Sequence, residues 1–302
     1  MISIATAPNS AFLANLSTVE ARILKDDNEV SSGLAVQQIS DAPDQVTEIL
    51  TLQAEISLNT QIGQNLGEVT SEVNAAEQAI TNGINLMNQA TQIGTEGANS
   101  TTGASTDQQL ASQVSDIITQ MFGLTKTQVQ GRYVFSGNSD QTPPYASVDL
   151  TQANAVGVYQ GSASTRTIQH PNGSTISVAF TAQQIFDSGG PSTSVFQSLT
   201  ELYNALQSGN SSSVTTALGD IRSASAYLNG MDGQYGDIQN EVTDATSFQA
   251  QYSTTLQTQL STAQDADEAT VITDMQQASI AEQAALQAHA ALPRQTLFSF
   301  LA

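Results

Sequence analysis

The fold is decided by residues 49–93, which read ILTLQAEISLNTQIGQNLGEVTSEVNAAEQAITNGINLMNQATQI. Inward-facing candidates recur along this stretch at steps of three or four residues. Such spacing predicts one amphipathic helix that pairs as helices do in a coiled coil. At about 1.5 Å per residue the helix would be roughly 67 Å long, a length that only a rod-shaped protein needs. The stripe consists of Ile49, Leu52, Ile56, Asn59, Ile62, Leu66, Val69, Val73, Ala76, Ile80, Ile84, Met87, Ala90 and Ile93.

The residues before and within this stretch leave two interpretations open. Asp41-Ala42-Pro43 precedes the stretch and offers an Asp cap with Pro in the first turn of a long helix. The alternative is a series of shorter helices that are broken at Gly63, Gly67 and Gly83.

Four more stretches have helical spacing. Residues 107–130 follow a turn at 94–106 and should pair antiparallel with the first helix as a hairpin. Residues 195–206 form a shorter stripe that ends at Gly209, and a long stripe runs from Ile238 almost to the end of the chain. Near the start, Phe12, Leu16, Val19 and Ile23 recur at steps of four, three and four.

Between these stretches the spacing changes to that of strands and turns. Residues 133–138 and 141–145 are expected to form a strand and a turn, and residues 165–170 and 174–180 a hairpin around Pro171-Asn172-Gly173. The predicted fold class is therefore mainly α: an elongated antiparallel helical bundle or coiled coil formed by the N- and C-terminal segments, with a small β-rich inserted domain.

The charge balance excludes several classes of partner. The 302 residues include 28 acidic and 7 basic ones, which gives a net charge of −21. Such a chain repels phosphate, so neither nucleic acid nor an anionic membrane is an expected partner. The chain has no Cys and no Trp, which excludes disulfides and thiolate metal ligands. Neither a Sec signal nor a run of 18 apolar residues is found, so no membrane span is predicted.

Nothing in the sequence supports catalysis. His170 and His289 lie in unlike surroundings, and the acidic clusters Asp26-Asp27 and 265–268 lack the Gly and distal Glu of a calcium loop. We interpret both clusters as solvated helix faces. The sequence contains no nucleophile elbow, phosphate-binding loop or zinc-binding His-Glu-x-x-His. We therefore expect no enzyme activity, no catalytic, cofactor-binding or metal-binding residue, and no cofactor.

The strongest functional signal is an apolar end. The residues Leu297, Phe298, Phe300 and Leu301, together with the stripe of Phe12, Leu16, Val19 and Ile23, are predicted to form an assembly interface. The alternative is that these residues dock on the body of their own chain.

Three stretches resemble the flagellin superfamily. Ser31-Ser32-Gly33-Leu34 with Ser40-Asp41-Ala42-Pro43 is similar to the family's N-terminal signature. Residues 265–277 with the apolar tail are similar to its terminal helix. The middle stretch resembles more narrowly the hook–filament junction proteins, also called hook-associated protein 3. That stretch is Gly131-Arg132-Tyr133-Val134-Phe135-Ser136-Gly137 followed by Thr142-Pro143-Pro144-Tyr145.

The resemblance implies a structural subunit of the bacterial flagellum that joins hook to filament by self-assembly of its terminal helices. Its expected partners are its own copies in a ring at the hook tip, neighbouring hook-associated proteins, filament flagellin and an export chaperone. Export through the flagellar type III channel without a cleaved signal would place it outside the cell. The implied domains are terminal assembly helices (1–45 and 260–302), a helical rod (46–139 and 191–259) and an outer β-rich insertion (140–190). The alternatives are filament flagellin and, from another class, a secreted coiled-coil adhesin or effector.

Overall fold

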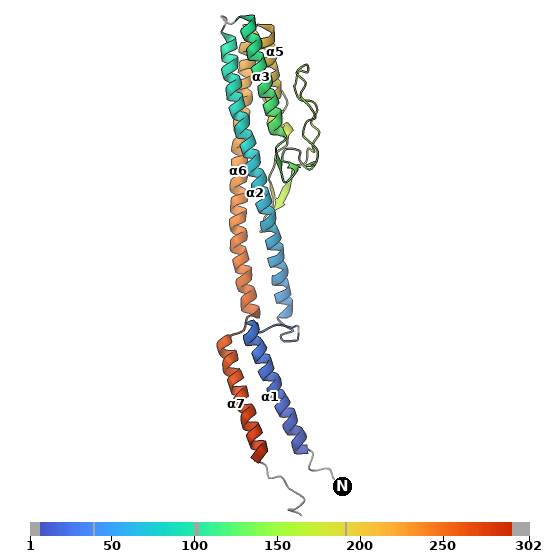
Figure 1. Cartoon of the computed structure of the whole chain (residues 1–302), viewed down its shortest axis with the longest axis vertical. Coiled ribbons are helices and arrows are strands. Elements are labelled where there is room, and N and C mark those ends of the chain that lie inside the picture. Colours follow the sequence, from blue (N-terminus) through green and yellow to red (C-terminus); the bar gives the residue numbers. More distant parts are fainter. Residues whose placement is uncertain (1–6, 39, 100–102, 191, 292–302) are drawn as a thin grey trace, which may run out of the picture. The chain divides into compact units, whose positions relative to one another are not determined.

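The computed structural model describes residues 7–38, 40–99, 103–190 and 192–291 (Figure 1). These residues are mainly helical and include two small antiparallel sheets, which confirms the predicted mainly α class with a small β-rich region. The elements are α1 (Ala7–Ser32), α2 (Val46–Ala98), α3 (Ala104–Thr125), β1 (Gln128–Val129), β2 (Arg132–Tyr133), β3 (Thr167–Gln169), β4 (Thr175–Ser177), α4 (Ala182–Phe186), α5 (Val195–Ser208), α6 (Ser211–Gln264) and α7 (Glu268–Ala291).

The chain divides into two compact units. The central unit comprises residues 58–252, and the terminal unit combines residues 1–57 with residues 253–302. The continuous hydrophobic core of the chain lies in the central unit, where it runs from Ile62 to Ala245.

The predicted stripe forms one continuous helix, α2, and every member of the stripe is buried or half-buried. The glycines at 63, 67 and 83 do not break it, so the alternative of shorter helices is wrong. Within the central unit α2 lies antiparallel to α6: Asn59 is hydrogen-bonded to Gln249, and further along the Asn74 side chain accepts a bond from Gln239. Three large side chains of the stripe have no accessible surface, namely Leu66, Ile80 and Met87.

The start of α2 differs from the prediction. The helix begins at Val46, so Pro43 is not in its first turn, and Asp41 does not cap it. The Asp41 carboxylate instead accepts hydrogen bonds from the backbone N–H groups of Gln37 and Gln38, at 3.0 and 2.7 Å. The acid preceding the helix therefore organises the loop before it.

The predicted antiparallel hairpin of α2 and α3 is present in the central unit (Figure 1). A side chain at Gly97 would meet Leu110 near the turn, and one at Gly83 would meet Met121 further along. The turn is shorter than predicted because α2 runs on to Ala98. At its other end α3 stops at Thr125 rather than at 130, and Val129 belongs to β1.

The β-rich region contains two hairpins. β1 pairs with β2, with Gln128 opposite Tyr133, and β3 pairs with β4, with Ile168 opposite Ile176. The hairpin around Pro171-Asn172-Gly173 is therefore confirmed, with shorter strands than predicted. The strand expected at 133–138 is wrong, because regular pairing ends at Tyr133.

The C-terminal half contains two long helices rather than one. α6 begins at Ser211, long before the predicted Ile238, and ends at Gln264. α5 ends as predicted at Gly209, which adopts a left-handed conformation with φ 64°. The acidic stretch 265–268, predicted as a solvated helix face, contains the break: the carboxylate of Asp267 accepts hydrogen bonds from Thr270 at the start of α7.

Candidate assembly interface

α1 and α7 form an antiparallel helix pair in the terminal unit (Figure 1). The ring of Phe12 on α1 stacks on the imidazole of His289 on α7, with centroids 4.0 Å apart and planes inclined by 7°. Further along, the guanidinium of Arg22 lies 3.3 Å from the carboxylate of Asp274. Both side chains of that ion pair are largely exposed, at 55% and 43%, so packing must hold the pair together more than charge does.

The predicted interface residues of α1 occupy one face of the helix. Phe12, Leu16, Val19 and Ile23 are all half-buried, and the Phe12 stack directs this face toward α7 of the same chain. The other four predicted interface residues, Leu297, Phe298, Phe300 and Leu301, lie outside the described residues. The structure therefore brings the α1 stripe against α7.

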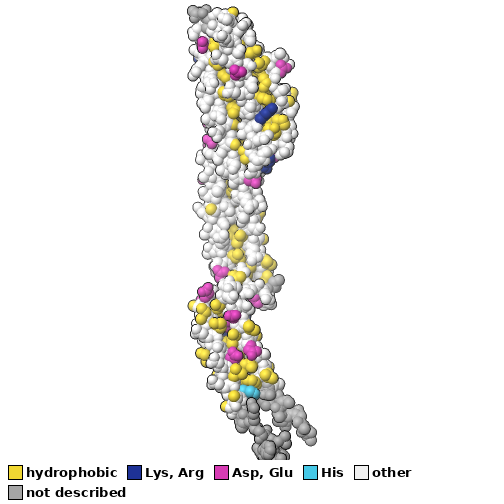
Figure 2. Space-filling model, in the orientation of Figure 1, with side chains coloured by type: hydrophobic (Ala, Val, Ile, Leu, Met, Phe, Trp, Pro, Cys, Tyr) yellow, Lys and Arg dark blue, Asp and Glu magenta, His cyan; other side chains and the backbone are white. Residues whose placement is uncertain are grey.

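Large apolar side chains also project from this helix pair into solvent, and the sequence analysis missed them. Leu13 and Leu24 of α1 are 58% and 64% exposed. Figure 2 shows apolar side chains on the surface of the α1–α7 pair. The outward residues of α7 are Ile272, Ile280 and Leu286. They fall between the positions of the inward stripes, so the spacing rule gives no signal for them.

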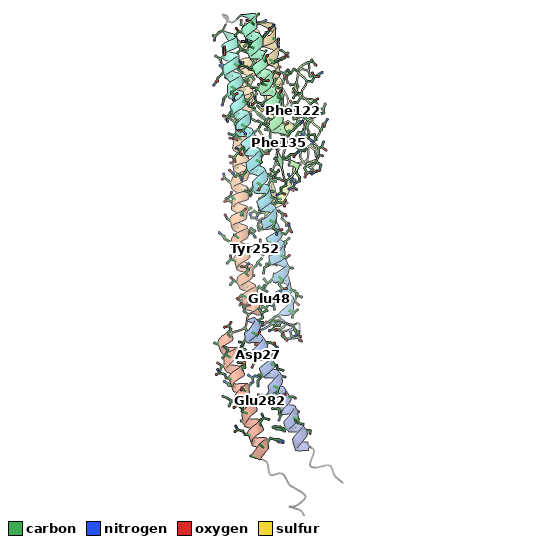
Figure 3. All side chains as sticks on the ribbon, viewed as in Figure 1. Asp27, Glu48, Phe122, Phe135, Tyr252 and Glu282 are labelled. Carbon is green, nitrogen blue, oxygen red and sulfur yellow. The ribbon has the colours of Figure 1, made fainter. Side chains whose placement is uncertain are left out.

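The apolar residues of α7 are spread around the helix among polar ones and do not form a single face. The helix is rich in alanine, and among its residues only Val271 and Ala278 are buried. Asp27 on α1 and Glu282 on α7 are two of the nine Asp, Glu, Lys and Arg side chains of this helix pair (Figure 3). Within the described chain α1 is the helix that packs on α7, which leaves much of the α7 surface open.

The Ser-Ser-Gly segment joins the helix pair at one end. Gly33, with φ 74°, ends α1, and its carbonyl accepts a hydrogen bond from Ala266 N at 2.9 Å. The carbonyl of Gln264 accepts a bond from Ala35 N at 2.8 Å, and Leu34 bridges to Asp265. The segment that carries the family resemblance is thus hydrogen-bonded to the break between α6 and α7.

Two carboxylates stabilise the backbone near this junction. Backbone N–H donors from Gln38 and Gln37 lower the pKa of Asp41, and side-chain and backbone donors of Thr270 lower the pKa of Asp267. Asp26, which lies on α1 and is largely buried, behaves in the opposite way. Its burial raises its pKa, and the attraction of Arg22 only partly offsets this.

A second site, in the central unit, holds the β-rich region on α2. Glu72 of α2 is buried, and its carboxylate lies 2.7 Å from Arg166 and 3.0 Å from Arg132. Arg132 also reaches Glu68, at 3.3 Å. Sequence analysis missed this cluster because Arg166 lies 94 positions from Glu72 in the chain. We call Glu72, Arg132 and Arg166 the carboxylate clamp.

The motif at 131–145 has a structural role in the central unit. Phe135 and Tyr145 are fully buried, and Phe135 lies between the helices and the β-rich region (Figure 3). Ser136 Oγ donates to the carbonyl of Thr142 at 2.6 Å. Gly137 has φ 58°, and a side chain there would collide with the carbonyl of Ser162. These residues therefore fix the course of the chain where it leaves the helices.

Neither histidine lies in a metal-binding cluster. Within the described ranges, no group of three or more His, Cys, Asp or Glu side chains is placed to hold a metal ion. His170 Nδ1 accepts a hydrogen bond from Asn172 N at 3.0 Å, and its ring lies beside Phe248. Among the described residues, no helix is both long enough and apolar enough to cross a membrane.

Comparison with known proteins gives matches only at the level of structure. No protein-family model and no curated protein matches the sequence. Hook-associated protein 3 of Legionella pneumophila superimposes with a TM-score of 0.62 at 13% identity, over 71% of this chain and 98% of that chain. FlgL of Xanthomonas campestris gives 0.60 at 15% identity, over 70% and 99% of the two chains.

A third solved structure, FlgL of Bacillus cereus, gives a TM-score of 0.57 at 16% identity over 70% of this chain and 99% of that chain. These structures come from three bacteria: two are FlgL and one is a flagellar hook-associated protein 3, and FlgL of Legionella pneumophila is described as a flagellar junction protein. The resemblance drawn from the sequence is thereby confirmed at the level of structure: this chain has the fold of FlgL, the flagellar hook-associated protein 3.

Proposed function

We propose that this chain is a structural subunit of the bacterial flagellum that joins hook to filament by self-assembly of its terminal helices. The observation that carries the proposal is the α1–α7 pair, whose large apolar side chains project into solvent while the core of the central unit is closed. The shared fold with hook-associated proteins supports the flagellar location.

The energetics favour a ring over an isolated pair of subunits. The five outward residues are Leu13, Leu24, Ile272, Ile280 and Leu286. Full burial of such a side chain contributes about 1.5–3 kcal/mol, and these are already partly covered. Association costs an estimated 4–15 kcal/mol before net binding appears. A subunit that touches several neighbours gains this burial on more than one face, whereas one contact gains little.

We assign a separate role to each of the proposed domains. The segments 1–45 and 260–302 assemble with neighbouring subunits, 46–139 and 191–259 form the stable helical part, and 140–190 form the outer insertion. The partners are copies of this chain, adjacent hook-associated proteins, filament flagellin and an export chaperone. Export through the flagellar channel places the subunit outside the cell.

Deletion of the gene tests the role in the flagellum. Electron microscopy of the deletion strain should show hooks without filaments. Intact filaments would contradict the junction role. Loss of the filament material itself, with the junction still on the hook, would favour filament flagellin, and normal flagella with lost adhesion would favour a secreted adhesin.

A charge placed on the outward face tests the interface itself. Leu24→Asp with Ile280→Asp should abolish incorporation at the hook tip while the purified chain melts nearly as the wild type does, because both side chains are exposed. Val158→Asp is the control, since Val158 is 88% exposed in the insertion and should be tolerated. Deletion of residues 297–302 should have the same effect as the double variant. Normal filaments from either variant would contradict this interface.

A further inference from the structure

The turn between β3 and β4 has a feature that the proposed function does not use. Asn172 and Gly173 occupy its tip, and both are exposed, as is Ser174. The side-chain oxygen Oδ1 of Asn172 accepts two hydrogen bonds from Ser174, from its N–H at 2.9 Å and from its Oγ at 2.7 Å. Gly173 has φ 90° and open space where a side chain would be.

This arrangement favours attack on the Asn172 side chain. The backbone nitrogen of Gly173 and the carbon Cγ of Asn172 are separated by few bonds, so joining them closes a five-membered ring within one segment. Negative charge then develops on Oδ1, and two donors directed at a carbonyl oxygen stabilise charge that develops there. Because Gly173 has no side chain, its nitrogen is open to rearrangement and to water.

One hydrogen bond of the attacking nitrogen opposes the reaction. Gly173 N donates to the carbonyl of His170 at 2.9 Å, and this bond must open before the nitrogen can attack. It is a single bond at an exposed turn, where local opening is frequent. A second hydrogen bond in the turn, from Asn172 N to His170 Nδ1, involves neither Gly173 N nor the Asn172 side chain and need not open for the attack.

We propose that Asn172 is a site of spontaneous deamidation. A bond forms between Gly173 N and Asn172 Cγ, the bond from Cγ to the amide nitrogen breaks, and the proton of Gly173 N leaves with that nitrogen as ammonia. Water then opens the cyclic imide at either carbonyl and gives aspartate or isoaspartate. The net reaction consumes one water and releases one ammonia, and it needs no enzyme, oxidant or metal.

The chain contains two internal controls for this proposal. Asn82-Gly83 lies within α2 and Asn229-Gly230 lies within α6. In these helices the glycine N–H is part of the backbone hydrogen-bond ladder, and the helical backbone keeps it from turning onto the preceding side chain. The Asn229 side chain is also held, since its Nδ2 donates to the carbonyl of Ser225 at 2.7 Å.

The products would act differently on the hairpin. Both products add one negative charge, and aspartate keeps a side-chain oxygen that can accept both bonds from Ser174. Isoaspartate instead adds a methylene to the backbone next to the last pair of the hairpin, Gln169 with Thr175. That product should loosen the hairpin and the contact between the rings of His170 and Phe248.

Peptide mass spectrometry of the full-length chain, incubated at neutral pH, tests the proposal. Asn172 should be converted at least about tenfold faster than Asn82 or Asn229, because misaligned reactive groups lose most of the intramolecular advantage. In concentrated urea the three rates should become similar, because the dipeptides are identical. Equal rates in the folded chain, or no conversion at Asn172, would overturn the proposal.

Two substitutions test the role of Ser174. Ser174→Ala removes the Oγ donor and should slow conversion at Asn172 about threefold, a smaller loss than that of a donor in a water-excluded active site. Ser177→Ala is the matched control in β4 and should leave the rate unchanged. If Ser174→Ala reacts at the wild-type rate, the role assigned to Ser174 is wrong. Gly173→Ala should slow the reaction further, because a side chain at this position hinders the approach of its nitrogen to Asn172 Cγ.

Discussion

The central and terminal units are built from the same kind of amphipathic helix and differ in how much apolar surface the chain itself covers. In the central unit the aromatic side chains of Phe135, Phe186 and Phe196 have no accessible surface. Among the described residues, the terminal unit exposes six large apolar side chains, namely Leu13, Leu24, Leu50, Ile272, Ile280 and Leu286, whereas the larger central unit exposes three, namely Leu58, Val158 and Phe248. The spacing of apolar residues therefore predicts a helix but not what packs against it. The apolar side chains that stay exposed in the folded chain indicate where a further partner packs.

The two units also differ in their charged contacts. The carboxylate clamp places a buried carboxylate between two arginines. The ion pairs Arg22–Asp274 and Lys25–Glu29 of the terminal unit involve basic side chains that are more than half exposed. Exposed pairs contribute less than about 1 kcal/mol and weaken with salt. Charge therefore holds the β-rich region in place more firmly than it holds α1 on α7.

The same substitution in both units should give the largest contrast. Leu66→Ala removes a side chain with no accessible surface and should cost about 2–5 kcal/mol of unfolding free energy, because it leaves a cavity. Leu24→Ala, at 64% exposure, should change the unfolding free energy by less than about 0.5 kcal/mol. Urea denaturation of both variants measures the difference. Equal losses would show that the terminal unit buries Leu24 in solution.

A second contrast lies within the charged cluster on α2. Glu72→Ala leaves Arg132 and Arg166 without their shared partner and should cost about 3 kcal/mol. This is the lower end of the range for a buried pair, because the arginines are 30% and 26% exposed. Glu68→Ala is the control: its side chain is 52% exposed, so it should cost less than about 1 kcal/mol. Similar losses in thermal denaturation would contradict the role of burial.

Asn59→Leu should have a smaller effect, in the stabilising direction. Asn59 is buried in the α2 stripe, donates to the carbonyl of Gln249 at 3.2 Å and leaves its own Oδ1 without a partner. Replacing it removes one hydrogen bond and one unpaired buried acceptor, which leaves a net gain of about 1 kcal/mol. The melting temperature should rise by about 2–4 °C, while the register of α2 on α6 becomes less specific. A lower melting temperature would show that the hydrogen bond is required.

The smallest effect concerns pH at the first turn of α7. The pKa of Asp267 is lowered from 3.8, so its contribution is present above that value and is lost as the pH falls through the lowered pKa. NMR chemical shifts of Ala269 and Thr270 should move toward coil values in acid. Burial raises the pKa of Asp187, so the free-energy cost of burying its charge disappears as the carboxylate is protonated at lower pH. The adjacent start of α5 should therefore not fray in acid. If the start of α5 frays at a higher pH than the start of α7, the roles assigned to Asp187 and Asp267 are wrong.

Local signals predicted part of the fold well. The spacing of apolar residues at steps of three and four predicted α2. Gly209 predicted the end of α5, and Pro171-Asn172-Gly173 predicted the second hairpin. Each of these signals acts within a few residues of the structure that it specifies. The start of α6 was missed because glycines at 219, 230, 233 and 236 lower the helix propensity of the stretch. These glycines lie off the buried stripe, which runs at steps of three and four from Val214 to Ile238 and packs within the core of the central unit.

The proposed interface was less predictable, because it depends on which apolar side chains the chain leaves uncovered. The stripe of Phe12, Leu16, Val19 and Ile23 was found by its spacing, and the structure places it against α7. Leu24 and Ile280 carry no sequence signal, since a single exposed apolar residue is common. The break at Asp267 was missed because an acid in a helix face and an acid that caps a helix look alike in sequence.

Hydrogen exchange of the purified, verified monomer tests the central claim most directly. Amides of α1 and α7 should exchange far faster than those of α2 and α6 between residues 62 and 245, because isolated Ala-rich helices with open apolar faces are marginal. The same amides should become protected when the subunit is assembled at the hook tip. Full protection of α1 and α7 in the monomer, equal to that of the central core, would contradict the claim that these helices complete their burial only between subunits.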